Sequence, residues 1–286
     1  MIDILIAIGI LGGLALVFGL VLAGASKVFY VEVDPRLEKL NECLPGANCG
    51  GCGYPGCGGY AEAVLNGEAP IGKCASGGAE CANAMAAVMG VEAGDVVRMV
   101  ALVKCSGHRT YDENGNQTGG AKMKGNYEGF KNCLAASKVG GRGPLACKYG
   151  CLGYGSCVAA CKYDAIHVVD GVAQVDREKC VGCMSCAAAC PRGVITAVPY
   201  EKTTFVPCNS NAKGAVTTRS CSAGCIGCGL CKKICPEGAI NVVNGLAVID
   251  YEKCISCGLC ATVCPKKIIV DLNEAPPAEA MERANL

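Results

Sequence analysis

The chain has 286 residues, 26 of them cysteines, with only two histidines and a formal net charge of +1. So high a cysteine content indicates either a disulfide scaffold or a metal protein. Disulfide scaffolds are usually short and secreted, whereas this chain is long and its cysteines are bunched at gaps of two or three residues, which favours metal. The scarcity of histidine favours iron–sulfur clusters over zinc, and the near-neutral charge gives no reason to expect nucleic acid as a partner.

The N-terminus has the composition of a membrane anchor. No charged residue occurs between Asp3 and Lys27, which leaves an uncharged run from Ile4 to Ser26. A helix over this run is long enough to cross the roughly 30 Å hydrocarbon core of a bilayer. A cleaved signal peptide would carry basic residues before its apolar stretch, but here they follow it, at Lys27, Arg36 and Lys39. The positive-inside rule then places the N-terminus outside and the cluster domains in the cytoplasm. We therefore expect a single-pass protein of the cell (inner) membrane, in contact with the lipid bilayer.

The clearest motif, C-x2-C-x2-C-x3-C followed by proline, occurs twice near the C-terminus. It is the cysteine run of bacterial two-cluster ferredoxins, in which the first three cysteines hold one cluster and the fourth holds the other. We expect the fourth cysteine to start a helix that points away from the first three. The predicted ligand sets are Cys225, Cys228, Cys231 and Cys264 for one [4Fe–4S] cluster, and Cys254, Cys257, Cys260 and Cys235 for the other.

A duplication extends this module toward the N-terminus. Residues 240–250 alternate around Asn244-Gly245, which predicts a β-hairpin, and short helices after each run would complete the α+β ferredoxin fold. The same unit occurs 74 residues earlier, where residues 166–176 carry Asp170-Gly171 at the turn. The cysteines that match at this offset are Cys161, Cys180, Cys183, Cys186 and Cys190.

The first half of this earlier copy departs from the pattern. Tyr154 stands where Cys228 would be, and Lys162 replaces the proline. Cys147 can supply the missing thiolate. The predicted ligand sets are Cys147, Cys151, Cys157 and Cys190 for the irregular cluster, and Cys180, Cys183, Cys186 and Cys161 for its partner. A three-iron cluster is the alternative at the irregular site.

A separate motif precedes both modules. Residues 48–60 read NCGGCGYPGCGGY and place Cys49, Cys52 and Cys57 within nine residues, with Cys74 further on. The glycines let the backbone bend round a cubane and offer amide N–H groups to its sulfurs. These four cysteines predict a further [4Fe–4S] cluster, with zinc as the alternative.

The order of these parts resembles the RnfB subunit of the Rnf complex over essentially the whole chain: an apolar N-terminal helix, CGxCGYPGC with a distal cysteine, then ferredoxin modules. The insert near 100–146 resembles that of the cysteine-rich clostridial members. The resemblance implies an electron-transfer subunit of a membrane-bound, ion-translocating ferredoxin:NAD⁺ oxidoreductase. Such a subunit takes electrons from soluble reduced ferredoxin and passes them to other Rnf subunits. No nucleotide-binding fingerprint occurs, so we expect no flavin or NAD and name no catalytic residue on this chain.

Six cysteines remain: Cys43, Cys81, Cys105, Cys133, Cys208 and Cys221. The first two look like spare thiols. Cys208 and Cys221 precede the second module at nearly the spacing that separates Cys133 and Cys147 before the first, so they belong to the duplicated architecture. We expect a sixth cluster on Cys105, Cys133, Cys208 and Cys221, which gives five or six [4Fe–4S] clusters in total. The alternatives are free buried thiols or an exchange of roles with Cys147.

The stretch 104–148, which covers most of the insert and the start of the first module, is also basic. Eight Lys or Arg residues face three acidic ones, an excess that would attract an acidic ferredoxin, although a solvated loop that touches lipid headgroups explains it equally well. The basic residues are Lys104, Arg109, Lys122, Lys124, Lys131, Lys138, Arg142 and Lys148, against Asp112, Glu113 and Glu128.

These features predict an α+β protein with seven parts. The parts are a transmembrane anchor (1–27), an N-terminal [4Fe–4S] domain (28–99), the basic insert (100–146), a first ferredoxin module (147–199), a connector (200–220), a second ferredoxin module (221–272) and a tail (273–286). Three other functions remain open at this stage. They are a polyferredoxin of another membrane hydrogenase or dehydrogenase complex, an enzyme that reduces a substrate at an irregular cluster, and a structural zinc protein.

Overall fold

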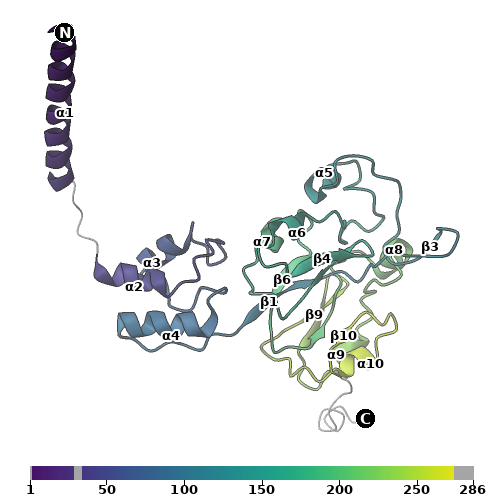
Figure 1. The fold of residues 1–286 in the computed structure, drawn as a ribbon. Coiled ribbons are helices and arrows are strands. Elements are labelled where there is room, and N and C mark those ends of the chain that lie inside the picture. Colours follow the sequence, from purple (N-terminus) through teal and green to yellow (C-terminus); the bar gives the residue numbers. More distant parts are fainter. Residues whose placement is uncertain (1, 29–33, 274–286) are drawn as a thin grey trace.

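The computed structural model describes residues 2–28 and 34–273. Figure 1 shows helix α1 (Ile2–Val28), a small helical part, and a larger part in which the strands lie. Among the described residues, no helix qualifies as long and apolar enough to cross a membrane, so the predicted anchor is not confirmed. The predicted tail lies outside the described residues from position 274 onward.

The small helical part consists of α2 (Pro35–Glu42), α3 (Cys57–Leu65) and α4 (Gly78–Met89). Asp34 caps α2 by accepting the N–H of Arg36 at 2.8 Å, ahead of a proline in the first turn. The core is closed by Leu40, Tyr60 and Met85, which are fully buried. The Tyr60 hydroxyl donates to the carbonyl of Pro70 at 2.9 Å and accepts the N–H of Lys73 at 3.1 Å, which fixes the loop that leads to Cys74.

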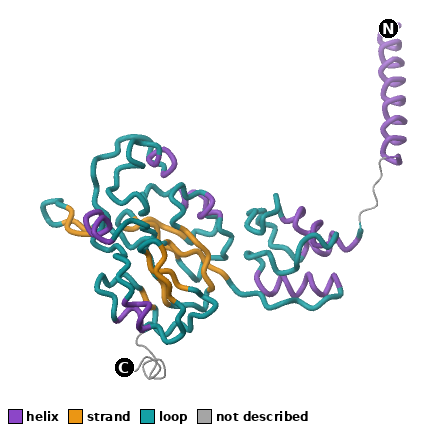
Figure 2. Tube along the Cα trace, turned by 180° about the vertical axis from the view of Figure 1, so that it is seen from behind, coloured by secondary structure: helices purple, strands orange, loops and turns teal. Residues whose placement is uncertain are grey.

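The larger part begins with β1 (Met99–Val103), which pairs antiparallel with β6 (Ile195–Pro199) in the register Ala101↔Ala197. The start of the insert therefore forms a sheet with the end of the first ferredoxin module. In Figure 2 most of the strands lie together near the centre of this part with loops around them, and one short hairpin projects from its edge.

Both predicted hairpins are confirmed. The first is β4 (Ile166–Val169) with β5 (Val172–Val175), and the second is β8 (Ile240–Val243) with β9 (Leu246–Ile249). All four turn residues have positive φ: Asp170, Gly171, Asn244 and Gly245. This is the type I′ geometry that Asp-Gly and Asn-Gly favour, because its twist matches that of the flanking strands.

The short helices of the two modules are present, but one expectation about them was wrong. They are α6 (Ser156–Ala160), α7 (Ser185–Ala188), α9 (Leu230–Ile234) and α10 (Leu259–Thr262). Each begins just before the third cysteine of a run, and the fourth cysteine ends the helix: Cys235 is the C-cap of α9 and Cys161 that of α6. One helical turn rises about 5.4 Å, so the fourth thiol stands at the other end of the helix, where it can meet a different site.

The insert and the connector supply the remaining elements. These are β2 (Thr110–Tyr111) with β3 (Gln117–Gly119), α5 (Cys133–Ser137), β7 (Thr204–Phe205) with β10 (Val270–Asp271), and α8 (Gly214–Ser220). Single β-bridges join Ala121 to Cys221 and Met123 to Leu145. The insert therefore wraps round and touches the connector, so that the two modules are joined through it.

Candidate metal centres

All 26 cysteines lie within residues 34–273 and are free thiols, so no disulfide holds this fold together. Most are buried or half-buried, and Cys228 is exposed. The disulfide-scaffold interpretation has no support in this structure.

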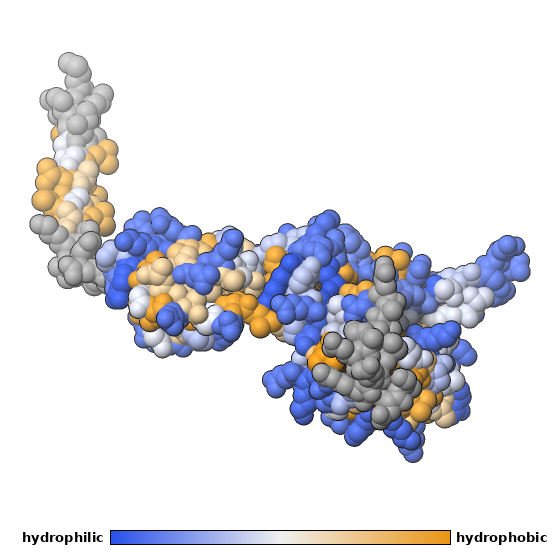
Figure 3. Space-filling view, turned by 90° about the horizontal axis from the view of Figure 1, so that it is seen from below, coloured by the Kyte–Doolittle hydropathy of each residue, from blue (hydrophilic) through white to orange (hydrophobic). Residues whose placement is uncertain are grey.

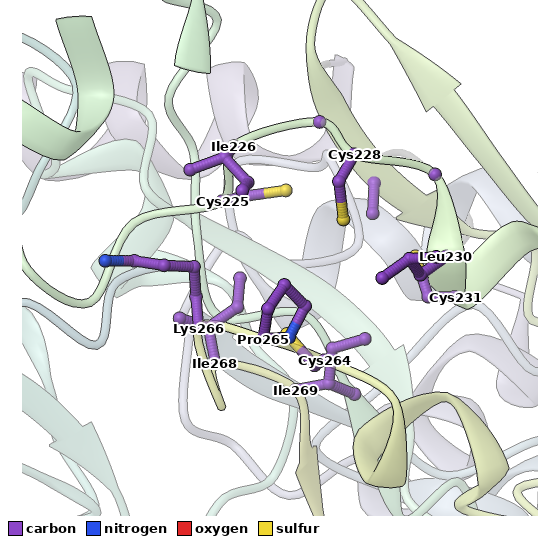
Figure 4. Close-up of a pocket in the computed structure, with 13 residues that line it drawn as sticks. Cys225, Ile226, Cys228, Leu230, Cys231, Cys264, Pro265, Lys266, Ile268 and Ile269 are labelled. Carbon is purple, nitrogen blue, oxygen red and sulfur yellow. The ribbon is translucent and has the colours of Figure 1, made fainter. Parts of the chain in front are cut away.

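One hollow in the second module is lined by four cysteines that come from both runs. Cys225 and Cys228 stand on one loop, Cys231 lies in the first turn of α9, and Cys264 reaches in from the other run. In Figure 4 the thiols of Cys225 and Cys228 point into the space that Cys231 and Cys264 also border. The remaining lining is largely apolar: Ile226, Leu230, Ala247, Pro265, Ile268 and Ile269. The structure thus gathers the four cysteines of one predicted set; their role as ligands stays a prediction.

Three further predicted sets are brought together in the same way. The cysteines that line a hollow in the small helical part are Cys49, Cys52, Cys57 and Cys74, and those that line one in the first module are Cys161, Cys180, Cys183 and Cys186. In the second module, burial first, and then the neighbouring thiols of Cys257, Cys254, Cys231 and Cys235, raise the pKa of Cys260 to about 12. Cys235, Cys254 and Cys260 pack in one core cluster, so the members of this predicted set also lie close together.

The structure does not bring together the set predicted for the sixth cluster. The hollow between the two modules is lined by Cys105, Cys208, Cys221 and, in place of Cys133, Cys147. A Cβ added to Gly150 would lie 3.5 Å from the Cys147 sulfur and 3.6 Å from the Cys105 sulfur. Cys147 therefore belongs with this group, which we call the bridging quartet.

Cys133 lies instead beside the irregular site. Its N–H donates to the Ser156 hydroxyl at 3.0 Å, next to Cys157. Burial first, and then the neighbouring thiols of Cys151 and Cys133, raise the pKa of the Cys157 thiol to about 12. Cys190 acts in the same direction, so Cys133, Cys151, Cys157 and Cys190 lie close together, and we call them the irregular quartet. These positions fit the exchange of Cys133 with Cys147 that the sequence left open; their role as ligands stays a prediction.

A sequence signal for this exchange existed. Cys221 follows Cys147 by the same 74 residues that separate the two modules, so these two cysteines hold equivalent places. Tyr154 occupies the position of the missing thiol and packs on Tyr127 of the insert, with ring centroids 5.3 Å apart. Two residues of the insert therefore lie at the place of the missing cysteine: Tyr127 packs on the Tyr154 ring, and Cys133 lies beside Cys157.

Backbone N–H groups connect neighbouring quartets. The N–H of Cys151 donates to the Cys105 sulfur at 3.3 Å, and the N–H of Cys225 donates to the Cys208 sulfur at 3.3 Å. The bridging quartet thus accepts one hydrogen bond from each module. Such bonds to ligand sulfurs tune a metal site.

The small helical part contacts the first module through its cysteine loop. A Cβ on Gly51 would lie 2.5 Å from the Cys183 carbonyl oxygen, and Lys162 donates to the Ala47 carbonyl at 3.0 Å. The loops of these two quartets are therefore in direct contact.

The two remaining cysteines stay outside the quartets. Cys81 is buried, with its sulfur 3.8 Å from that of Met85, and burial raises the pKa of its thiol to about 12. Cys43 is half-buried in the same core. Both fit the interpretation as spare thiols: Cys81 because a buried thiol with a raised pKa stays neutral and unreactive, and Cys43 because it lines none of the four hollows.

The donor chemistry fits iron–sulfur cubanes. Within the described chain, no His, Asp or Glu lines the four hollows, and no three His, Cys, Asp or Glu side chains are placed to hold a metal ion directly. What the hollows offer is four soft thiol donors around a space, which suits a group larger than one ion.

Comparison with known families agrees with these positions. A family described as "Putative Fe-S cluster" matches residues 44–76, a "4Fe-4S binding domain" matches 173–196, and a "4Fe-4S dicluster domain" matches 224–268. The N-terminal motif and both modules thus carry iron–sulfur signatures.

Three curated RnfB proteins are similar over most of the chain. The one from the Na(+)-translocating ferredoxin:NAD(+) oxidoreductase complex of Acetobacterium woodii is 45% identical over 87% of this chain and 72% of its own length. Its counterpart from the proton-translocating complex of Clostridium ljungdahlii is 42% identical over 86% and 83%. The one from the ion-translocating oxidoreductase complex of Methanosarcina acetivorans is 40% identical over 86% and 90%.

Proposed function

The chain belongs to the RnfB family of the ion-translocating ferredoxin:NAD⁺ oxidoreductase complexes, and from this we propose that it passes single electrons along six [4Fe–4S] sites arranged in a row. It is an electron-transfer subunit of such a complex, with the other subunits as its partners. The observation that carries the six-site arrangement is the bridging quartet, which lies between the two ferredoxin modules.

The proposed ligand sets revise the sequence prediction at two sites. In the order of the row they are Cys49, Cys52, Cys57 and Cys74; Cys161, Cys180, Cys183 and Cys186; Cys133, Cys151, Cys157 and Cys190; Cys105, Cys147, Cys208 and Cys221; Cys225, Cys228, Cys231 and Cys264; and Cys235, Cys254, Cys257 and Cys260.

The order follows from contacts between neighbours. Gly51 meets Cys183 at the first junction. Within each module the two sites share short helices that pack on each other, α6 on α7 and α9 on α10. The bridging quartet meets both modules through the two N–H···S bonds to Cys105 and Cys208. A continuous row from the small helical part to the second module is therefore supported at every junction.

The protein's own contribution is to bind, to tune and to keep water away. Bound at these sites, a [4Fe–4S] cubane supplies reversible one-electron redox chemistry. The cysteines hold it, and the backbone N–H groups donate to their sulfurs. Buried apolar side chains such as Ile166, Ile240 and Ile268 close the surroundings to solvent, which sets the local dielectric.

We propose that reduced ferredoxin, the electron donor, docks on the basic stretch 104–148. Six of the eight basic side chains of this stretch are exposed: Lys122, Lys124, Lys131, Lys138, Arg142 and Lys148. An exposed basic surface raises the rate of encounter with an acidic protein. This assignment is the docking part of the proposal and is tested separately below.

We also propose that α1 anchors the chain as a single membrane pass, with its N-terminus outside and the clusters in the cytoplasm. The support is the uncharged stretch from residue 4 to 26 and the exposure of apolar side chains such as Leu11, Leu16 and Leu20. Figure 3 shows apolar surface around the described middle of this helix. A lipid core favours a helix that is apolar all round.

The test interrupts the row in the middle. In the assembled complex, Cys208→Ser removes one ligand of the bridging quartet, whereas Cys43→Ala removes a thiol that we place outside every quartet. We expect the first variant to abolish ferredoxin-dependent NAD⁺ reduction while the other clusters remain reducible, and the second to retain the wild-type rate. Full activity in the Cys208→Ser complex, with the bridging cluster absent, would overturn the serial relay.

A further inference from the structure

A buried arginine stands at the junction between the irregular and bridging quartets. Arg192 follows Cys190 and Pro191, and it is only 8% exposed. Among the described residues, no Asp or Glu forms an ion pair with it. An unpaired buried charge loses much of its hydration without compensation, so this guanidinium needs a compensating negative charge.

Its hydrogen bonds fix the guanidinium in one place. Nη1 donates to the carbonyl oxygens of Cys147 at 3.1 Å and Gly150 at 3.4 Å, and Nη2 donates to that of Arg142. The loop that accepts these bonds carries one cysteine of the bridging quartet, Cys147, and one of the irregular quartet, Cys151. The arginine is therefore held against both quartets at once.

The guanidinium Nε is unpaired. It is buried and has no hydrogen-bond partner among the residues that the structure describes. A buried donor without an acceptor loses the hydrogen bond that water would provide. Together with the missing counter-charge, this leaves a fixed positive group beside the sulfurs of Cys147, Cys151 and Cys190, which would carry negative charge as cluster ligands.

We infer that Arg192 is a tuning residue: its fixed positive charge raises the reduction potentials of the irregular and bridging clusters. This inference rests on the proposed function, because it requires clusters at these two quartets. A cubane on four thiolates is anionic and gains one more negative charge when its donor supplies one electron. A nearby fixed cation in a low-dielectric site stabilises the reduced form more than the oxidised form.

The second module offers the natural contrast. Lys266 stands 74 residues after Arg192, again directly after Cys-Pro. It is half-buried and borders the hollow of Cys225 and Cys264. A partly hydrated ammonium on a flexible stem acts more weakly than a buried guanidinium held by three carbonyls. Arg192 and Lys266 therefore raise the reduction potentials of the clusters on the two sides of the bridging quartet by different amounts.

The experiment compares charge with hydrogen bonding. The full-length chain is prepared anaerobically as wild type, Arg192→Gln and Arg192→Lys, with Arg142→Gln as the matched control because its side chain is exposed and lies beside the same loop. Each protein is assayed for iron and sulfide, then reduced stepwise with dithionite while EPR records the spins that appear.

In Arg192→Gln we expect full iron content. In the plot of EPR signal against potential, we expect one or two of the six clusters to be reduced only at lower potential, while the others are unchanged. At the ambient potential where those clusters are half reduced in the wild type, their reduced-to-oxidised ratio should fall about tenfold, which is 59 mV for a one-electron couple. Arg192→Lys should recover most of the ratio, and Arg142→Gln should follow the wild-type curve.

Equal curves for wild type and Arg192→Gln would overturn the inference, as would equal shifts in the Gln and Lys variants. Loss of iron from all Arg192 variants would also overturn it and assign the residue a structural role. A wild-type chain without any reducible cluster would instead contradict the proposed function itself, so the two failures are distinguishable.

Discussion

The two ferredoxin modules have the same hairpins and short helices but are completed in different ways. The second takes its eight cysteines from two regular runs between Cys225 and Cys264. The first has Tyr154 where the second has Cys228, and in the proposed ligand sets Cys133 of the insert, which lies beside Ser156 and Cys157, supplies the missing thiol. Its cation after Cys-Pro, Arg192, is also buried, whereas Lys266 is half-buried. A duplicated module can thus lose a ligand and survive if a non-local segment replaces it.

The two modules therefore differ in how far they depend on the insert. The second module is built from local sequence and should assemble its clusters by itself. The irregular site and the bridging site need the insert, since Cys133 and Cys105 come from outside the first module. In the proposed ligand sets the insert therefore provides more than positive charge. Cys133 completes the irregular quartet, and Cys105 is a member of the bridging quartet.

The largest effect tests which cysteines share a site. Two substitutions in one quartet remove one cluster, and two in different quartets remove two. We expect Cys133→Ser/Cys157→Ser to lose the iron of one cluster and Cys147→Ser/Cys157→Ser that of two. Iron and sulfide analysis of anaerobic protein measures the difference. The opposite result would restore the ligand sets read from spacing, and Cys228→Ser/Cys231→Ser in the regular module calibrates the loss of one cluster.

This exchange marks the limit of what the sequence predicted. The hairpins and regular runs were predictable, because turn residues and three closely spaced cysteines act within a few positions of each other. The partners of Cys133 and Cys147 were not, because they depend on how residues 100–146 fold back over the module. The role of Arg192 could not be predicted either, because the sequence shows only a cation after Cys-Pro. Its burial is visible only in the folded structure.

A smaller effect tests where the soluble donor docks. Reversal of two exposed lysines of the insert, Lys122→Glu with Lys124→Glu, should slow electron uptake from reduced ferredoxin about tenfold at low salt and flatten its salt dependence, because steering is lost. The matched control reverses Lys232 and Lys233, two exposed lysines close to Cys228. Stopped-flow reduction measures both.

Unchanged uptake in the insert variant, with slow uptake in the control, would move the docking surface to the second module. That outcome would agree with the exposure of Cys228 and contradict the assignment to the insert.

The smallest effect concerns the matched hairpin turns. Gly171 and Gly245 both have positive φ, so alanine at either should cost about 1–2 kcal/mol of stability. At Gly171 a Cβ would also collide with the Arg109 guanidinium, whereas at Gly245 the nearest atom is the Ala212 carbonyl oxygen at 3.4 Å. We expect Gly171→Ala to lower the melting temperature more than Gly245→Ala. Equal losses in calorimetry would show that Arg109 moves aside freely.

The central claim is that the cysteine quartets hold iron–sulfur cubanes, six in number. The most direct measurement is the iron, acid-labile sulfide and zinc content of the full-length chain purified anaerobically, together with its EPR spectrum after reduction. We predict iron and sulfide in equal amounts, sufficient for six cubanes, with a reducible low-potential signal. Zinc without sulfide, or no signal on reduction, would contradict the account.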